Sequence, residues 1–597
     1  MKSKRWLLLV PGAVLVALWS GCGQKASLPS PGQPLTSPLV AAGEPGQPGG
    51  RLTLTSPGVP QTFNPLLASD AASEDVIRLL FAPLVRFDPV AQTPQPALAE
   101  SWTVEPDQRT WTFTLRRGLR WSDGQPLTAA DVVFTWNEVM YNPDMNRQTY
   151  DLFRIAGRNF TVTRVDEQTV RVVTPEVFAP FLEFFGGVVI LPEHAIGQAV
   201  RARRFLSIHT LHTRPERIVG SGPFRVKECQ PGQHVLLERN PEYWVVDRQN
   251  RRLPYLDEVL LLASDSTTAP FLFFSGKTDL FERTRPEDYA HFQETAAGGN
   301  FRLVELGAGT ERDFLWFNLN TNLNAAGRHV VNPTRLVWFQ NKKFRQAVSC
   351  ALDRDRIVRE VYGGRAQPLH TFASAEDRKW NNPQVPLFAH DPARARALLG
   401  EIGIRDRDGD GVLESAAGAK LEFSFFTNSG NRARERTAAL IAEDLGRIGM
   451  KVDLQLLPFT NLVDRIGRTF DYECILMGVG GAGSEPASQM NVLKSSEPLH
   501  QWFPEQARPA TEWEARIDAL MDEQMRTLDH ARRKQHYDEV QTILAEELPM
   551  IFTVSPFHFA VVRADLGNLR PSALTAHRLT WNLEELFFRS SINPGPR

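Results

Sequence analysis

The sequence predicts an α/β protein built from two or three lobes. About 548 residues follow the first 49, which is more than one hydrophobic core accommodates. A strand, a helix and a strand follow one another between residues 421 and 457, and this order is typical of a partly parallel sheet. Ligands of such sheets bind at the carboxyl ends of the strands. We therefore expect an α/β fold with its site at that edge.

The spacing of apolar residues locates the individual elements. Phe344, Ala347, Val348, Ala351 and Leu352 recur at helical spacing and predict a helix over residues 344–352. The other predicted elements show either strand alternation or one apolar helix face. They are strands 51–54, 110–115, 421–426, 450–457 and 472–477, and helices 438–448, 511–527 and 530–547.

The N-terminus has the pattern of an export signal. A basic start precedes an uncharged run over residues 6–18, about half the length that spans a bilayer. Small residues then lead to Cys22, which predicts a lipoprotein signal over residues 1–21 and acylation of Cys22. Trp19 stands where such signals usually carry Leu. A cytosolic protein with an apolar N-terminal helix and an uncleaved membrane anchor are the alternatives.

Residues 22–49 are rich in Gly, Pro, Ser, Gln and Ala and show no periodicity. Such a composition cannot bury a core, so we expect a flexible tether. Together with the signal, the tether places the protein outside the cytoplasm. It would lie in the periplasm or on the outer face of a bacterial membrane, held there by Cys22.

Charge and cysteine content exclude several classes of protein. There are 67 basic and 69 acidic residues without a long run of either sign, which argues against a nucleic-acid partner. Beyond residue 20 no apolar run is long enough to cross a membrane. Cys229, Cys350 and Cys474 are too far apart for a metal cluster or a disulfide framework. We expect Cys350 and Cys474 to be small core residues.

Short motifs then recur in a fixed order over residues 51–560. They include Pro60-Gln61-Thr62-Phe63-Asn64-Pro65-Leu66, Leu115-Arg116-Arg117-Gly118-Leu119-Arg120-Trp121, Gly220-Ser221-Gly222-Pro223-Phe224, Arg239-Asn240-Pro241-Glu242-Tyr243-Trp244 and Asp391-Pro392-Ala393-Arg394-Ala395. In these motifs the chain resembles the extracellular solute-binding proteins of the oligopeptide, dipeptide and nickel type, solute-binding family 5. The resemblance implies a monomeric receptor without a cofactor. It would bind a peptide or other small solute and deliver it to an ABC permease and ATPase complex.

The resemblance also implies a layout for the chain. The fold would be periplasmic-binding-protein-like, with two lobes, an inserted subdomain and two hinge crossings. Lobe I would comprise residues 50–77, 188–306 and 556–597. The inserted subdomain II would span 78–187, and lobe III would span 307–555.

A glycine-rich segment follows the predicted strand 472–477. Gly478-Val479-Gly480-Gly481-Ala482-Gly483 matches the G-x-G-x-x-G pattern of dinucleotide-binding proteins. That pattern needs a helix opening at its last glycine and an acid on a strand about twenty residues later. Here Ser484-Glu485-Pro486 follows, and no clear strand carrying an acid is evident near residue 500. We therefore interpret the match as accidental, and the resemblance places this loop in the ligand cleft.

The same loop departs from the pattern of peptide receptors. The oligopeptide and dipeptide receptors carry an aspartate there that pairs with the α-ammonium of the ligand, and Ala482 takes its place in this chain. Val479 stands where a Trp is often found. A buried ammonium without a carboxylate costs several kcal/mol. We therefore expect a ligand rich in hydrogen-bond acceptors rather than a peptide with a free amine.

The candidate ligand-binding residues lie at predicted strand ends and at positions that the resemblance implies. They are Phe63, Asn64, Asn318, Asn428, Ser429, Val479, Gly480, Gly481, Ala482 and Gly483. Each of these residues also fits a plain turn.

An acidic turn at residues 406–411 begins like a calcium-binding loop. Asp406, Asp408 and Asp410 stand at positions 1, 3 and 5, and a glycine stands at position 6. Position 12 holds Ala417 instead of Glu. A solvated acidic turn and a weak structural Ca²⁺ site are both compatible with this pattern.

The sequence contains no catalytic pattern. The histidines are scattered, and we expect His209 and His212, in a basic stretch, to be exposed. There is no nucleophile elbow, so we predict that the protein is not an enzyme. Two alternatives remain: an exported hydrolase acting on peptides or glycans, and an envelope-assembly protein that keeps the fold without transport.

Overall fold

A computed structural model describes residues 36–142, 153–155, 157–296, 298–324, 326–479, 485–504 and 506–589. Its strands form three large sheets and several two-stranded ones. Each large sheet draws most of its strands from a different part of the chain. The signal 1–21 and Cys22 lie outside the described residues.

The C-terminal half of the chain forms a five-stranded α/β sheet. Its order is β20-β19-β21-β17-β22, and β19 pairs in parallel with both β20 and β21. β17 runs antiparallel to β21. The bounds are β17 (Arg312–Phe317), β19 (Glu422–Asn428), β20 (Lys451–Leu457), β21 (Cys474–Val479) and β22 (Ile551–Phe552). The partly parallel sheet predicted from the sequence is confirmed.

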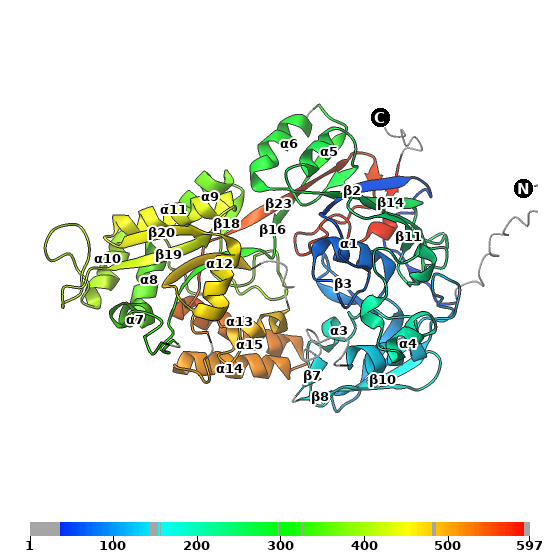
Figure 1. Cartoon of the computed structure of the whole chain (residues 1–597), viewed down its shortest axis with the longest axis horizontal. Helices are drawn as coiled ribbons and strands as arrows, with labels where there is room; N and C mark the ends of the chain where they lie inside the picture. Colours follow the sequence, from blue (N-terminus) through cyan, green and yellow to red (C-terminus); the bar gives the residue numbers. More distant parts are fainter. Residues whose placement is uncertain are drawn as a thin grey trace, which may run out of the picture. The chain divides into compact units, whose positions relative to one another are not determined.

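Helices surround this sheet and bury its aromatic core. Figure 1 shows α11 above the strands and α14 and α15 below them. The helices are α7 (Pro333–Gln340), α8 (Lys342–Ala351), α9 (Arg354–Tyr362), α10 (Pro392–Glu401), α11 (Arg432–Arg447), α12 (Phe459–Asp464), α13 (Met490–Leu493), α14 (Glu512–Met525) and α15 (His530–Glu547). α11 begins at its N-cap Asn431, and the chain turns into β20 at Gly449, whose φ of 92° favours glycine. Among the helices of the described residues, none is both long and apolar enough to span a bilayer.

An eight-stranded sheet occupies the part of the chain expected to form lobe I. Its order is β11-β12-β14-β2-β15-β23-β16, with β18 paired to β23. The bounds are β2 (Arg51–Pro57), β11 (Phe224–Gln230), β12 (His234–Arg239), β14 (Glu258–Ser264), β15 (Leu280–Phe281), β16 (Phe301–Ala308), β18 (Ala366–Pro368) and β23 (Val554–Arg563). α1 (Ala71–Leu80), α5 (Ala269–Phe274) and α6 (Tyr289–Ala296) accompany it. β18 comes from the range predicted for lobe III, so the two parts share a strand pairing.

A four-stranded antiparallel sheet lies within the predicted insertion. Its order is β5-β6-β10-β9. The bounds are β5 (Ala99–Val104), β6 (Thr110–Leu115), β9 (Thr161–Arg164) and β10 (Thr169–Val173), with α2 (Ala129–Phe134), α3 (Phe181–Phe184) and α4 (Glu193–Arg201) beside them. The hairpin of β3 (Val85–Asp88) and β4 (Thr93–Pro96) precedes this sheet. The lobe boundaries themselves stay a prediction.

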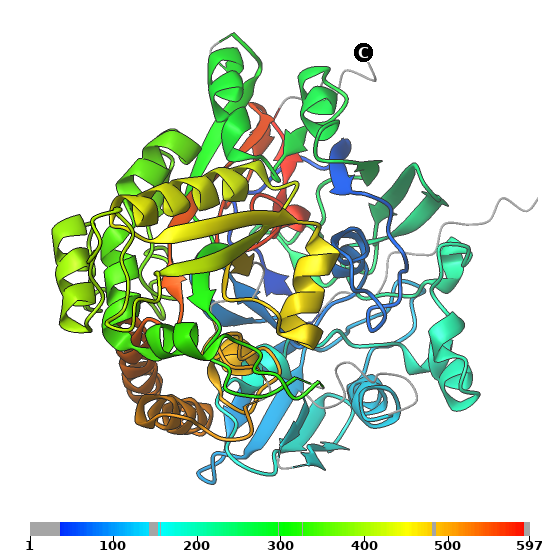
Figure 2. The same cartoon turned by 60° about the vertical axis from the view of Figure 1, so that its left-hand side comes forward.

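Two short segments connect consecutive strands of the eight-stranded and five-stranded sheets, apart from the longer path of the chain through β18. β16 ends at Ala308 and β17 begins at Arg312, while β22 ends at Phe552 and β23 begins at Val554. The two crossings are joined, because both the backbone N–H and the hydroxyl of Thr553 donate to the carbonyl of Asp313 at 3.0 Å. In Figure 2 the orange β23 lies behind the strands of the five-stranded sheet. Both parts belong to one unit within residues 35–597.

Residues 36–49 differ from the flexible tether predicted over 22–49. β1 (Leu39–Val40) pairs in parallel with β13 (Val245–Val246), and Ala41 is buried. Gly46 lies so close to Phe587 and Tyr255 that an added Cβ would come within 2.5 Å of the phenyl ring. Small residues therefore let this segment lie flat against the molecule. A search for periodicity misses such a segment, because it packs through its backbone.

His209 also differs from the prediction, whereas His212 is exposed as expected. The side chain of His209 is buried beside Phe81, with ring centroids 5.8 Å apart, and neither ring nitrogen has a hydrogen-bond partner among the described residues. The basic character of the neighbouring sequence led to the wrong prediction. A left-handed backbone at His209, with φ of 53°, accompanies this inward placement. Cys350 and Cys474 are buried, as expected of small core residues.

We predict that acid destabilises the fold in part through His209. Burial lowers the pKa of its imidazole to about 4, so between pH 6.5 and 4 the unfolded chain binds a proton that the folded chain does not. Stability is therefore fully present above pH 6.5 and falls by roughly 3 kcal/mol as the pH drops to 4. Denaturant unfolding across this range measures the slope.

The matched variant is His209→Asn, because Asn tolerates positive φ and does not titrate. Its unfolding free energy should depend less steeply on pH than that of the wild type. His370, whose pKa burial also lowers to about 4, keeps part of the dependence in both proteins. An unchanged slope in His209→Asn would contradict the assignment.

Candidate functional site

The carboxyl ends of the parallel strands meet at one edge of the five-stranded sheet. β19 ends at Asn428, β20 at Leu457 and β21 at Val479. The antiparallel β17 begins at the same edge, because Arg312 pairs with Val479. The chain leaves β21 there into the glycine-rich loop. This edge is the one at which open α/β sheets bind ligands.

An ion pair organises the centre of this edge. The guanidinium of Arg434 in α11 donates to Asp313 at 2.8 Å and to the side-chain oxygen of Asn428 at 2.7 Å. Gly478 lies directly beneath the pair, and an added Cβ would overlap the Asp313 carboxylate. The glycine therefore gives room for the ion pair rather than a nucleotide phosphate. The sequence analysis did not identify Arg434 or Asp313.

Two predicted site residues lie at this edge. Asn428 is buried and its side-chain oxygen accepts from Arg434. Ser429 is exposed, and its backbone N–H donates to Leu457 at 2.7 Å. Val479 pairs with Arg312 through its backbone, and Gly480, Gly481, Ala482 and Gly483 lie outside the described residues. The hydroxyl of the exposed Ser429 also donates to the Leu457 carbonyl at 3.2 Å, and Asn428 helps to hold Arg434.

Three other predicted site residues have buried side chains that bond or pack inside the protein. Phe63 is fully buried in the hydrophobic core of the eight-stranded sheet. The Asn64 amide donates to the carbonyl of Phe205 at 3.1 Å. The Asn318 amide donates to the carbonyls of Phe470 and Tyr472 at 2.9 and 3.0 Å. In this conformation these side chains shape turns and do not face a cavity.

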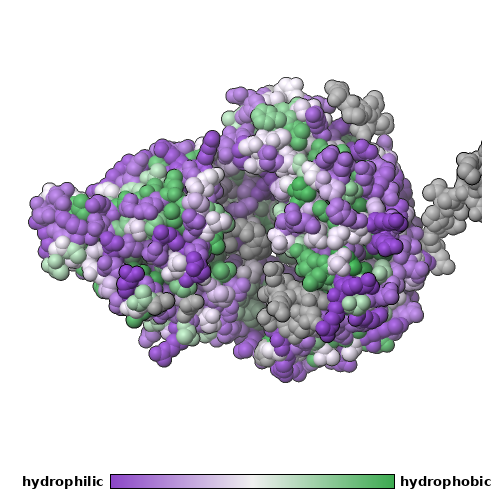
Figure 3. All heavy atoms as spheres, in the orientation of Figure 1, coloured by the Kyte–Doolittle hydropathy of each residue, from purple (hydrophilic) through white to green (hydrophobic). Residues whose placement is uncertain are grey.

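A cavity lies between the predicted subdomain II and the predicted lobe III, and we call it the interlobe cavity. It encloses about 720 Å³. One wall is formed by residues 91–94 together with Ala179, Pro180, Leu182 and Glu183. The other wall is formed by Arg378, Lys379, Glu485, Leu528, His530 and Arg533. In the sequence Glu485 comes two residues after Gly483, the last glycine of the glycine-rich segment. Figure 3 shows the molecule hollowed between its two halves, with both hydrophilic and hydrophobic residues around the hollow.

Direct hydrogen bonds join the two walls. The Gln92 amide donates to the carbonyl of Glu376 at 2.7 Å and accepts from the backbone N–H of Lys379 at 3.1 Å. The backbone N–H of Ala179 donates to the carbonyl of Met525 at 2.7 Å. Gln92 is buried, so its two bonds form a clamp that water does not replace.

Two ion pairs line the interlobe cavity. Lys379 and Glu183 pair at 2.8 Å across the two walls. Arg533 grips both carboxylate oxygens of Glu485, and both side chains are buried. Burial raises the pKa of Glu183, the nearby Glu485 raises it further, and Lys379 opposes the shift. Sequence patterns could not reveal these partners, since each pair joins residues far apart in the chain.

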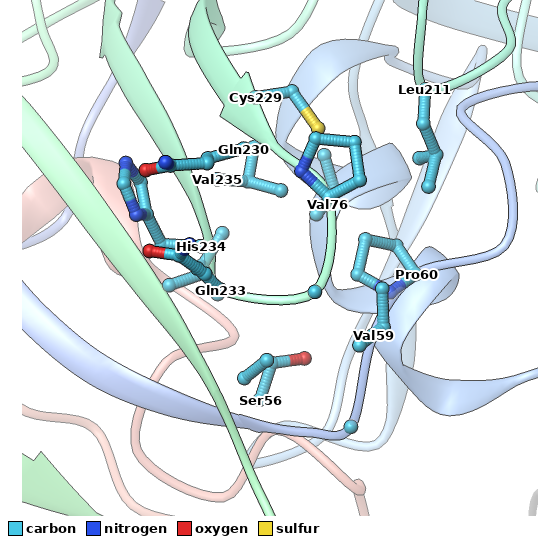
Figure 4. Close-up of a pocket in the computed structure, with 15 residues that line it drawn as sticks. Ser56, Val59, Pro60, Val76, Leu211, Cys229, Gln230, Gln233, His234 and Val235 are labelled. Atoms are coloured by element: carbon cyan, nitrogen blue, oxygen red, sulfur yellow. The ribbon is translucent and has the colours of Figure 1, made fainter.

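Two further cavities are less suited to a ligand held between lobes. The one in Figure 4, which Ser56, Pro60, Cys229 and His234 help to line, holds about 10 Å³, roughly one water molecule. The other is lined by residues between Gln125 and Ala202, all on one side of the hinge. Only the interlobe cavity, of these three in the described residues, has walls from both sides.

The acidic turn contains a lysine ammonium among its carboxylates. Lys420 bonds to Asp408 at 2.6 Å and to Asp410 at 2.8 Å. Oxygens of Asp406, Asp408 and Glu414 lie within 4.8 Å of one another, a grouping that differs from the predicted Asp406, Asp408 and Asp410. Because Lys420 neutralises two of these acids, it would compete with a cation. Weak Ca²⁺ binding stays a prediction.

Two α/β parts joined by two crossings, with a cavity lined from both sides, define a two-lobed binding protein. A profile of the bacterial extracellular solute-binding proteins, family 5, matches residues 93–500. The chain belongs to this family, and its fold is the periplasmic-binding-protein-like fold predicted by resemblance.

Individual relatives agree with this assignment over most of the chain. A probable ABC transporter-binding protein of Deinococcus radiodurans is 28% identical over 555 residues, covering 87% of this chain and 91% of the relative. The oligopeptide-binding protein AppA of Bacillus subtilis is 27% identical over 571 residues, covering 93% and 94%. The structure of AppA in complex with a nonapeptide superposes with a TM-score of 0.66 at 25% identity, covering 92% of this chain and 100% of AppA.

We predict that Gln92→Ala loosens the contact between the walls. The change removes two hydrogen bonds of a buried amide, each worth about 1 kcal/mol. Hydrogen exchange at residues 376–380 and 91–94 should become faster, while the rest of both sheets keeps its protection.

Gln95→Ala is the matched control. Gln95 lies in the same hairpin, and its side-chain amide donates to the hydroxyl of Thr93 at 2.9 Å within that hairpin. Its exchange pattern should equal that of the wild type. Equal protection in Gln92→Ala would show that the clamp does not hold the walls together.

Proposed function

We propose that this chain is the substrate-binding receptor of an ABC importer for peptides or peptide-like solutes. Family membership supports binding and transport. The observation that carries the proposal is the interlobe cavity, since its lining comes from both sides of two chain crossings. A ligand there contacts both lobes and favours the closed form. The closed receptor would then deliver the ligand to the membrane permease.

Closure of this kind is a shift between two populated conformations. A ligand moves the equilibrium only by the difference between its affinities for the open and closed forms. The Gln92 clamp and the Lys379–Glu183 pair add contacts that do not involve ligand. They bias the receptor toward closure, so that fewer ligand contacts are needed.

A peptide-like ligand is supported by the named relatives. AppA is an oligopeptide-binding protein, and its structure contains a nonapeptide. Extended peptides can be held mainly through their main-chain groups. The glycine-rich residues 480–483 would offer backbone groups for this, and the hydroxyl oxygen of the exposed Ser429 could still accept a hydrogen bond. Ala482 supplies no carboxylate for a free amine.

We predict one-to-one binding of an N-acetylated nonapeptide without turnover. Because the loop lacks a carboxylate, the acetylated form should bind as tightly as the free amine or more tightly. In a receptor with the aspartate, acetylation would leave a buried carboxylate unpaired, at about 1–3 kcal/mol or more. Calorimetric titration gives stoichiometry and affinity, and mass spectrometry shows whether the peptide stays intact.

Gly481→Trp should fill the cleft and abolish binding without unfolding the protein. Gly298→Trp is its control, because Gly298 is exposed with open space around its Cα. Hydrolysis of the peptide would support an enzyme instead. A strong preference for the free amine would mean that another carboxylate pairs with it, and normal affinity in Gly481→Trp would remove the loop from the site.

We further propose that Cys22 carries acyl chains that hold the receptor at a membrane. The signal-like residues 1–21 and the export implied by the family support this. A single chain anchors only marginally, whereas two or more hold a protein stably.

Cys22→Ser should leave the precursor unprocessed or release the protein into the soluble fraction. Fractionation and the mass of the mature N-terminus measure this outcome. Unchanged size and membrane retention in the variant would exclude lipidation at this residue.

A further inference from the structure

The interlobe cavity carries more positive than negative charge. Arg378, Lys379 and Arg533 line it against the carboxylates Glu183 and Glu485. The N-terminus of α15, an 18-residue helix, also opens into it at His530. A helix N-terminus carries a partial positive charge that adds to the side chains.

Both carboxylates that line the cavity already form ion pairs. Glu183 pairs with Lys379, and Glu485 pairs with Arg533 and is buried with it. Asp377 lies behind the lining, and burial raises its pKa to about 7, so this carboxyl is partly neutral at physiological pH. Asp529, the N-cap of α15, accepts the backbone N–H of Arg532. Within the described residues none of these acids forms an ion pair with Arg378.

A buried indole fixes the positions of the cations. The Lys379 ammonium lies 5.3 Å and the Arg533 guanidinium 5.1 Å from the ring centroid of Trp380. His530 meets the same ring edge-on at 4.9 Å. Burial lowers the pKa of His530, and the charges of Lys379 and Arg533 lower it further. The contribution of these two cations to the lowered pKa indicates a positive electrostatic potential at the His530 imidazole.

Arg378 is the cation without an acidic partner. Its side chain is exposed, and it donates to the carbonyl of Val90 at 2.9 Å. Within the described part of the chain it makes no ion pair. A guanidinium presents several donors in a planar fork that matches a carboxylate. The guanidinium of Arg378 is therefore free to bind an anionic group of a ligand.

We propose that the interlobe cavity binds a carboxylate of the ligand through Arg378, with His530 and the N-terminus of α15 beside it. The proposal rests on the proposed function and narrows its ligand to an anionic peptide or peptide-like solute. It agrees with the loss of the loop aspartate at Ala482, because both features disfavour a cationic group and favour acceptors. The carboxylate is either the C-terminal group or an acidic side chain.

The test uses the full mature receptor, stripped of bound ligand by denaturation and refolding. A synthetic pool of N-acetylated nonapeptides is prepared with free carboxylate and with carboxamide C-termini, and the captured fraction is quantified by mass spectrometry. A second pool, all carboxamides, compares Glu with Gln at each position. The wild type should enrich the anionic form about tenfold or more in one of the pools, as charge-assisted bonds to arginine predict. The enriched pool identifies the source of the carboxylate.

Arg378→Gln should abolish this enrichment, and Arg378→Lys should restore part of it. Arg248→Gln is the matched control, because Arg248 is also exposed and donates to a single carbonyl, that of Ala42, at 2.9 Å. Thermal unfolding of each variant confirms that it is folded. Equal capture of charged and neutral forms by the wild type, or full enrichment in Arg378→Gln, would overturn the proposal.

A second probe separates this inference from the peptide assignment. Succinate and succinamide are compared for thermal stabilisation of wild type and Arg378→Gln at equal ionic strength. If succinate stabilises the wild type but not Arg378→Gln, and succinamide stabilises neither, the carboxylate site is supported even when no peptide is captured. In that case only the assignment of a peptide ligand is refuted. Equal effects of the two compounds on the wild type would refute the carboxylate site.

Discussion

The bond between Thr553 and the carbonyl of Asp313 holds the two chain crossings side by side, and the arrangement of the site depends on it. Asp313 also binds Arg434 through its carboxylate, and Arg434 in turn holds Asn428 at the end of β19. Asp313 therefore connects the two crossings to the edge of the five-stranded sheet where β19 ends. A movement of the crossings shifts the strand start that carries Arg312 and Asp313, so lobe motion and site geometry are mechanically linked.

The α/β elements could be predicted because their apolar spacing follows from local geometry. Residues 110–115 form β6 with the predicted bounds, and the predicted helix 344–352 lies almost entirely within α8. Apolar spacing does not reveal a segment that packs through its backbone. For this reason the sequence did not predict that residues 36–49 are attached to the rest of the protein. That segment is held by parallel pairing of β1 with β13 and by the close approach of Gly46 to Phe587, and neither leaves a periodic trace.

The site was less accessible to sequence reasoning for a different reason. Asn428 and Ser429 were predicted because they follow a predicted strand. Asn318 was predicted by the same rule and Asn64 by the family resemblance, but both side-chain amides donate to main-chain carbonyls inside the protein. The charges that line the interlobe cavity come from loops and a helix N-terminus. The ion-pair partners of these charges lie far away in the chain, as Lys379 is from Glu183. Only the folded structure therefore shows which charges form ion pairs and which do not.

The attachment of residues 36–49 also determines how long the linker between Cys22 and the folded protein would be in a lipid-anchored receptor. The chain is fixed from Ser37 onward, whose hydroxyl accepts the backbone N–H of Arg117. Fourteen residues, 23–36, then separate Cys22 from Ser37, and a chain of this length spans at most roughly 50 Å. The full 22–49 segment would have reached nearly twice as far. With Cys22 acylated as proposed, the shorter segment would keep the receptor nearer the bilayer and would raise its effective concentration at a permease in the same membrane.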